Sequence, residues 1–315
     1  MDSPVDALNE VPARFKLVNA LPAALFVCTV GVLLLSGAPQ EAPAFNHLLE
    51  SARRFGWAGA AAAVGLVAVG AVLLEPLELA SIRLLEGYWS AWGPLRRAAD
   101  LGRWVQRRKL ERLKLLTDVA QARSIPSADI DAELLNFPSS GALLPTALGN
   151  RLRAFEERAG RAYGLQAIVL WPRLYYVLPD AVLSYVARTR NQLDTASRLC
   201  LTLILSAAAA AVLLATHPLW WLVPLAMLAG AMVAYRSALA AAGNFGVAVT
   251  AAIDVYRLRL LQEMRVDMPA DTAGERTIND QLSLLWAGEK RAGVRYAPAN
   301  SDIAVYLQAL RRDQP

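Results

Sequence analysis

The sequence predicts an all-α integral membrane protein with four transmembrane helices and helical cytoplasmic extensions. Of its 315 residues, 56% are hydrophobic and 19% are charged, whereas soluble domains average roughly 45–50% and about 25%. The apolar residues gather in four blocks of 17 to 19 residues that contain no charged side chain. Each block is close to the roughly 20 residues that a helix needs to cross the hydrocarbon core.

The four blocks divide the chain into five segments. The predicted spans are residues 18–36, 57–74, 199–216 and 219–235. We expect a cytoplasmic N-terminal segment at residues 1–17 and a first transmembrane hairpin at 18–75. A basic helical cytoplasmic region follows at 76–198, and a second hairpin at 199–235. The chain then continues as a cytoplasmic helix with a polar tail at 236–315. We interpret the first block as a retained span, because its leader is acidic and no small-x-small cleavage site follows.

The orientation follows from the distribution of basic residues. Residues 76–198 hold 18 Lys and Arg against 12 Asp and Glu, whereas residues 37–56 hold only two basic residues. Cytoplasmic loops carry the excess of basic residues, so we expect residues 76–198 and both termini to face the cytoplasm. The chain has only four lysines among its 32 basic residues, which is typical of a GC-rich bacterial genome and indicates a bacterial inner membrane.

A basic helix is expected over residues 96–114. It carries eight basic and two acidic residues, with apolar side chains interleaved. The candidate lipid or partner contacts in this segment are Arg96, Arg97, Arg103, Trp104, Arg107 and Arg108. Contact with anionic headgroups is the favoured interpretation. A partner-binding helix is the second interpretation, and nucleic-acid binding is the third, because no recognition motif accompanies the modest net charge of +5.

The segment 165–178, LQAIVLWPRLYYVL, is apolar but too short to cross a bilayer. Its candidate contact residues are Trp171, Arg173 and Tyr175. Three interpretations stay open: the segment packs against the cytoplasmic end of the bundle, lies at the membrane interface, or lines a small-molecule site. The first is favoured.

Other helices are expected around this segment. Pro145 and Thr146 open a helix that Gly160 or Gly164 closes. A further helix begins at Asp180 and continues into the third span, and the fourth span continues through residues 237–264. Asp254 and Arg257 are spaced to form an i,i+3 pair.

Three stretches together resemble an uncharacterised family of multi-pass membrane proteins of high-GC bacteria. They are LPTALGNRLRAFE at 144–156; YG at 163–164 with WPRL at 171–174 and LP at 178–179; and DVYR at 254–257. The resemblance implies a multi-pass membrane protein and brings no activity with it. The span count and the cytoplasmic bulk are also similar to bestrophin-type anion channels, at the level of architecture alone.

The sequence favours a function without catalysis. It contains no glycine-rich phosphate loop, no nucleophile elbow and no zinc-ligand spacing, so we predict no catalytic, cofactor-binding or metal-binding residue. The absence of charged residues from the four spans argues against an ion-coupled transporter. We expect a membrane-anchored scaffold or adaptor that forms homo-oligomers or recruits a cytoplasmic protein. The alternative is a homo-oligomeric pore or channel.

Overall fold

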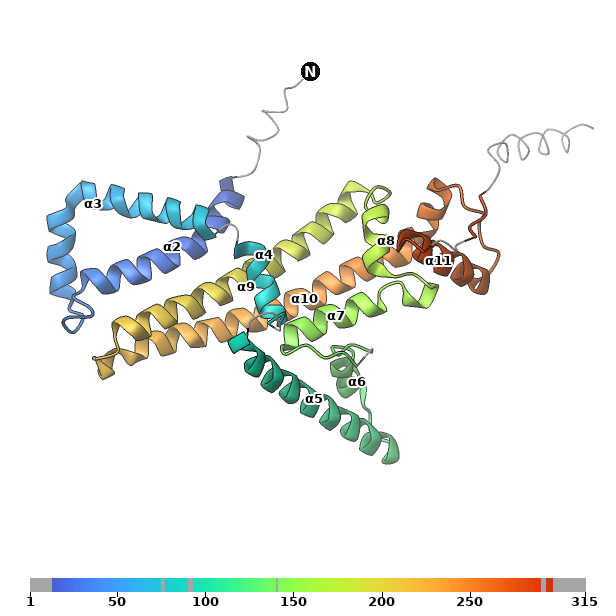
Figure 1. The fold of residues 1–315 in the computed structure, drawn as a ribbon, viewed down its shortest axis with the longest axis horizontal. Helices are drawn as coiled ribbons and strands as arrows, with labels where there is room; N and C mark the ends of the chain where they lie inside the picture. Colours follow the sequence, from blue (N-terminus) through green and yellow to red (C-terminus); the bar gives the residue numbers. More distant parts are fainter. Residues whose placement is uncertain (1–12, 75–76, 90–92, 140, 290–292, 297–315) are drawn as a thin grey trace, which may run out of the picture. The chain divides into compact units, whose positions relative to one another are not determined.

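The computed structural model describes residues 13–74, 77–89, 93–139, 141–289 and 293–296 (Figure 1). These residues form an all-helical fold in which no strand occurs, although Val266 and Tyr296 make an isolated antiparallel bridge. The predicted fold class is therefore confirmed as all-α. Most of the predicted N-terminal segment and the end of the predicted polar tail lie outside the described residues.

The elements follow one another along the chain with short connections. In order they are α2 (Ala13–Leu35), α3 (Phe45–Leu74), α4 (Leu77–Glu86), α5 (Gly93–Ala122), α6 (Ala128–Leu134), α7 (Ala147–Arg158), η1 (Arg161–Tyr163), α8 (Ala167–Leu174), α9 (Asp180–Leu213), η2 (Pro218–Trp221), α10 (Leu222–Glu263) and α11 (Thr272–Trp286).

The chain forms two compact units, and each is assembled from segments that are distant in sequence. Unit 1 contains residues 1–107, 144–149 and 190–242, and unit 2 contains residues 108–143, 150–189 and 243–315. The boundaries fall inside α5, α7, α9 and α10, so these four helices contribute to both units. Each unit is described below by itself.

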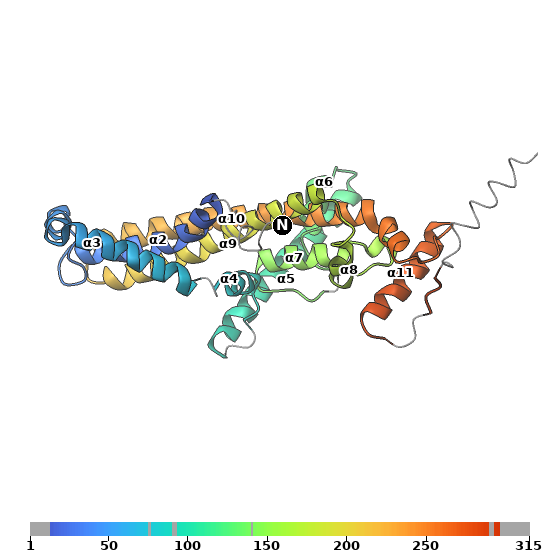
Figure 2. The ribbon, with the colours of Figure 1, turned by 90° about the horizontal axis from the view of Figure 1, so that it is seen from above.

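In unit 1, α2 and α3 form a helical hairpin (Figures 1 and 2). Gly56 interrupts α3 with φ 49° and ψ −142°, a backbone conformation that glycine adopts without a Cβ clash. The apolar helix after this kink begins at Trp57, where the second span is predicted. Near the end of α2, Leu33 and Ala38 are buried with Ala210 and Leu214 from the end of α9.

Two helical segments of the described chain are long and apolar enough to cross a membrane. They are Asp180–Leu213 and Pro218–Glu263, and they contain nearly all of the third and fourth predicted spans. In α2 the corresponding apolar stretch, Ala24–Leu35, is shorter. The length and composition of the helices thus support two spans, and they do not confirm the prediction of four.

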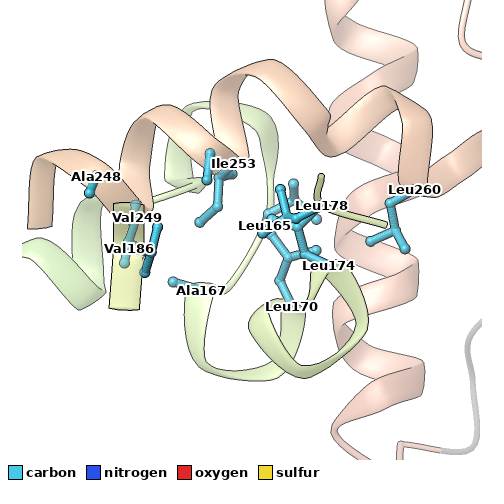
Figure 3. Close-up of a cluster of buried hydrophobic side chains, with 12 residues drawn as sticks. Leu165, Ala167, Leu170, Leu174, Leu178, Val186, Ala248, Val249, Ile253 and Leu260 are labelled. Atoms are coloured by element: carbon cyan, nitrogen blue, oxygen red, sulfur yellow. The ribbon is translucent and has the colours of Figure 1, made fainter. Parts of the chain in front are cut away.

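Unit 2 contains a core between three helices. Leu170 and Leu174 from α8 are fully buried with Ile253 from α10, and Val186 from α9 lies in the same cluster (Figure 3). The buried positions of α8 recur every three or four residues, which is the spacing of one helical face. One face of the apolar segment 165–178 is therefore buried in the hydrophobic core of unit 2, whereas five of its fourteen residues are exposed.

Glycines with positive φ end several helices near their predicted positions. Gly160 (φ 78°) follows α7 as expected. Likewise, α4 ends at Glu86 and is followed by Gly87 (φ 93°). Helices commonly end with a glycine in this left-handed conformation.

Candidate functional site

The candidate contacts on α5 are mostly exposed. Arg96, Arg97, Arg107 and Arg108 are exposed, and Trp104 is 49% exposed. Arg96–Arg107 belongs to unit 1 and Arg108 to unit 2.

Arg103 is half-buried, unlike its basic neighbours on α5. Its Nη2 lies 2.5 Å from Oδ1 of Asp100, one turn earlier on the helix. The Asp100 carboxylate is exposed, so this pair contributes little to stability. Of the basic candidates between residues 96 and 107, Arg103 is paired with Asp100, and the other three extend from exposed positions.

Glycines and a proline fix the position of α5 within unit 1. A Cβ atom on Gly102 would lie 2.7 Å from the carbonyl oxygen of Pro145, and one on Gly87 would lie 2.7 Å from the Pro145 ring. A Cβ atom on Gly149 would overlap with the carbonyl oxygen of Glu86. Real Cβ atoms do not approach other atoms this closely, so glycine is required at these three positions. We call this arrangement the Pro145 cradle.

Hydrogen bonds connect the Pro145 cradle to α10. Thr146 Oγ1 donates to the carbonyl oxygen of Glu86 at 3.0 Å and accepts from the Gly149 N–H at 3.0 Å, which caps the start of α7. The Leu148 N–H donates to the Tyr235 hydroxyl at 3.2 Å. Tyr235 is the last residue of the predicted fourth span, so the cradle lies at the cytoplasmic end that we predict for this span.

Sequence reasoning did not identify the Pro145 cradle. The signal that could have revealed it is Gly102, which lies inside a segment with a clear helical pattern. A glycine in a helix interior costs roughly 0.5–1 kcal/mol relative to alanine, and it often marks a close approach by another segment.

The candidate residues on α8 lie in different environments. Trp171 is partly buried against the core of unit 2. Arg173 is also partly covered: its Nη1 donates to the Val169 carbonyl oxygen at 2.6 Å, and its Cζ lies 5.1 Å from the centroid of the Trp286 ring. Only Tyr175 of the three is exposed. The structure therefore brings Trp171 and Arg173 into packed positions and leaves Tyr175 on the surface.

The exposed Tyr175 has an aromatic neighbour in the turn that follows α8. Tyr176 is 87% exposed, and its ring meets that of Tyr175 edge to face at 6.0 Å. Ile168 and Pro172 are also exposed. These four residues belong to α8 and the turn that follows it: Ile168 and Pro172 lie one turn apart on the helix, and Tyr175 and Tyr176 come directly after its last residue, Leu174. We call this surface the α8 face.

A buried ion pair joins α11 to α10 in unit 2. Arg257 Nε lies 2.6 Å from Oε1 of Glu275, and both side chains are largely buried. The guanidinium Cζ also lies 3.7 Å from the centroid of the Tyr163 ring, a cation–π contact. The predicted partner, Asp254, instead accepts a hydrogen bond through its backbone carbonyl oxygen. The Arg257 guanidinium thus contacts Asp254 through its backbone and pairs with the carboxylate of Glu275, which comes within reach only in the folded unit.

Further polar contacts fix α11 against the turn at Tyr163 and Gly164. Asn279 is buried, and its Nδ2 donates to the Tyr163 carbonyl oxygen at 2.9 Å. A Cβ atom on Gly164 would lie 2.7 Å from the Arg276 carbonyl oxygen, so glycine permits the close approach of α11. The YG and DVYR stretches, which are distant in sequence, therefore meet at α11.

An ion pair between α5 and α6 affects a carboxylate in unit 2. Lys109 Nζ lies 2.5 Å from Oε1 of Glu133. Partial burial raises the pKa of Glu133, but the hydrogen bond and charge of Lys109, with a hydrogen bond from Asn136, outweigh it, so the pKa lies below its usual value.

The candidate contacts belong to both units of the chain. The α5 residues from Arg96 to Arg107 lie in unit 1, whereas Trp171, Arg173 and Tyr175 lie in unit 2. Among the described residues, no group of three or more His, Cys, Asp or Glu side chains could hold a metal ion. No protein-family model, curated protein or solved structure matches this chain.

Proposed function

We propose that this chain is a non-enzymatic, membrane-anchored helical scaffold that assembles through the α8 face. The four predicted spans anchor it in a bacterial inner membrane, with residues 76–198 and both termini in the cytoplasm. Unit 2 presents the α8 face to a second copy of the chain or to a cytoplasmic protein. The observation that carries the proposal is the exposure of two adjacent tyrosines in the turn that directly follows α8, a helix with one buried face.

The α8 face has the composition of a protein interface. Tyrosine is enriched among the residues that contribute most to binding between proteins, and Tyr175, Tyr176 and Ile168 are all more than half exposed. Single exposed apolar residues are common. In this case, however, Ile168, Tyr175 and Tyr176 come from one short helix and the turn that directly follows it, which favours a contact surface.

The core of unit 2 holds the α8 face in a fixed conformation. Leu170 and Leu174 are fully buried beneath it (Figure 3), and Arg173 is fixed by its contacts with Val169 and Trp286. A surface that is ordered before binding loses less conformational entropy on association. This property suits a scaffold.

Replacement of Tyr176 tests the proposal in the full-length protein. We expect Tyr176→Ser to weaken self-association or partner binding about tenfold, since truncating an interface hot spot costs more than 1 kcal/mol. The thermal unfolding midpoint should stay unchanged, because the side chain is exposed. Sedimentation in detergent over a concentration series measures the association, and thermal unfolding of the same samples measures the stability.

The matched control is Tyr296→Ser, which removes a tyrosine that is also exposed in unit 2. It should leave the mass and the stability unchanged. If neither variant alters the oligomer mass, and neither alters the set of proteins that copurify from native membranes, the α8 face does not function in assembly.

A pore is the second candidate, and one observation favours it. The hydroxyls of Ser197 and Ser206 on α9 are buried and have no hydrogen-bond partner among the described residues. Buried hydroxyls normally find a partner or a water molecule, and an oligomeric pore would supply water. Conductance across a planar bilayer distinguishes this function: a scaffold gives no current, whereas a pore gives a current that Ser206→Val reduces.

A further inference from the structure

The first half of α5 presents a basic surface in which apolar side chains are interleaved. Arg96 and Arg107 lie along one edge, and Arg97, Leu101 and Trp104 follow each other at intervals of four and three residues. Leu101 is 62% exposed and Trp104 is 49% exposed. We call these five residues the α5 face. They all belong to unit 1, as do all four predicted spans.

The Pro145 cradle determines where the α5 face lies. Gly102 contacts Pro145 closely, and the same short segment donates the Leu148 N–H to the Tyr235 hydroxyl. At 100° per residue, Gly102 and Trp104 lie on nearly opposite sides of the helix. The side of α5 that bears Gly102 is therefore covered, and the α5 face is exposed near the predicted cytoplasmic end of the fourth span.

We propose that the α5 face binds the anionic headgroups of the bilayer that the spans cross. This inference rests on the membrane anchoring proposed above, but it is independent of assembly through the α8 face. Arginine binds phosphate through paired N–H groups, and tryptophan is enriched at the level of the headgroups. The position beside a predicted span end favours lipid over a soluble polyanion or an acidic protein.

The experiment compares two lipid environments for the full-length chain. The protein is incorporated into nanodiscs of phosphatidylcholine alone, or of phosphatidylcholine mixed with phosphatidylglycerol. Hydrogen exchange of the amides in residues 96–107 is then measured by mass spectrometry. Each basic residue near an anionic surface contributes a factor of about five in affinity, so we expect exchange to slow about fivefold or more in the anionic nanodiscs. High salt should remove the difference, because it screens the charges.

A charge reversal and its matched control test the residues themselves. Arg97→Glu combined with Arg107→Glu should abolish the lipid-dependent protection of residues 96–107. Arg265→Glu combined with Arg295→Glu makes the same change of charge at exposed positions in unit 2 and should preserve the protection. If the charge reversal prevents folding, the salt titration of the parent protein still shows whether the protection of residues 96–107 depends on charge.

The possible outcomes separate this inference from the proposed function. Equal exchange in both kinds of nanodisc, with the chain inserted, would overturn lipid binding by the α5 face and leave the anchoring intact. Failure of the chain to insert would overturn both. Protection of residues 96–107 by double-stranded DNA or by an added acidic protein, without protection by anionic lipid, would reassign the surface and overturn the inference.

Discussion

At the level of single residues, the buried pair of Arg257 and Glu275 has the largest expected effect on stability. Both charges are largely removed from water, so removal of one partner leaves the other charge uncompensated. The Tyr163 ring contacts the same guanidinium. These contacts join three elements of unit 2 that are far apart in sequence.

We expect Glu275→Ala to lower the free energy of unfolding of unit 2 by about 3–5 kcal/mol, the usual effect of breaking a buried pair. The control is Glu263→Ala, which removes an exposed carboxylate 3.9 Å from Arg259 and should change stability by about 0–1 kcal/mol. Chemical unfolding in detergent, followed by exchange of the α11 amides, measures both. Equal effects of the two substitutions would show that the pair does not hold α11.

The lowered pKa of Glu133 predicts a pH dependence in the contact between α5 and α6. Because the folded pKa lies below the usual value of 4.5, the contribution is fully present above pH 4.5. It is lost as the pH falls below that value and Glu133 becomes protonated. Amide exchange in α6 should therefore accelerate on acidification, and Lys109→Met should remove most of this dependence. An unchanged pH profile in Lys109→Met would contradict the assignment. The pair is partly exposed, so solvent screening keeps the effect small.

At the level of elements, glycines determine which helices come close together. The Pro145 cradle requires three glycines, and Gly102 is the one in the middle of a long helix. Replacing glycine by alanine stabilises a helix at most positions. At Gly102 it should instead destabilise the protein, because the added methyl group has no space.

We expect Gly102→Ala to destabilise the protein by about 1–3 kcal/mol, as overpacking does, although alanine is the better helix former. Gly243→Ala in α10 is the control, because a Cβ atom at that position would make an ordinary 3.7 Å contact with Arg151. It should leave the thermal midpoint unchanged or raise it. A rise for Gly102→Ala as well would show that Pro145 moves aside easily.

At the level of the whole molecule, the membrane topology is the property to test. The four charge-free blocks and the arginine distribution predict that residues 37–56 face outside and that residues 76–198 and 236–315 face the cytoplasm. The lengths and composition of the helices support two spans, so the prediction for the first hairpin stays a prediction.

Single cysteines test this topology once Cys28 and Cys200 have been replaced. We expect Gln40→Cys to react with an impermeant thiol reagent in intact cells. Gln121→Cys and Thr277→Cys, at exposed positions, should react only after lysis. Labelling of Gln121→Cys before lysis would show that the chain has the opposite orientation. Protection of Gln40→Cys before lysis would show that the first hairpin does not cross the membrane as a pair of spans.

The sequence by itself determined the all-helical class, the two apolar helices that begin at Asp180 and near Pro218, and the glycine that ends α7. These features follow from local information, namely runs of apolar residues, their period and a backbone conformation that favours glycine. It also found the apolar segment 165–178, but it left open where that segment packs.

Only the tertiary structure decided which side chains meet. It buried Leu170 and Leu174, left Tyr176 exposed, paired Arg257 with Glu275, and placed Pro145 against Gly102. Each of these outcomes depends on segments more than 15 residues apart in sequence. The composition and the periodicity of one segment do not predict where the other segment lies in the folded chain. The contacts depend on how the helices pack, because the interior has space for one side chain and excludes another.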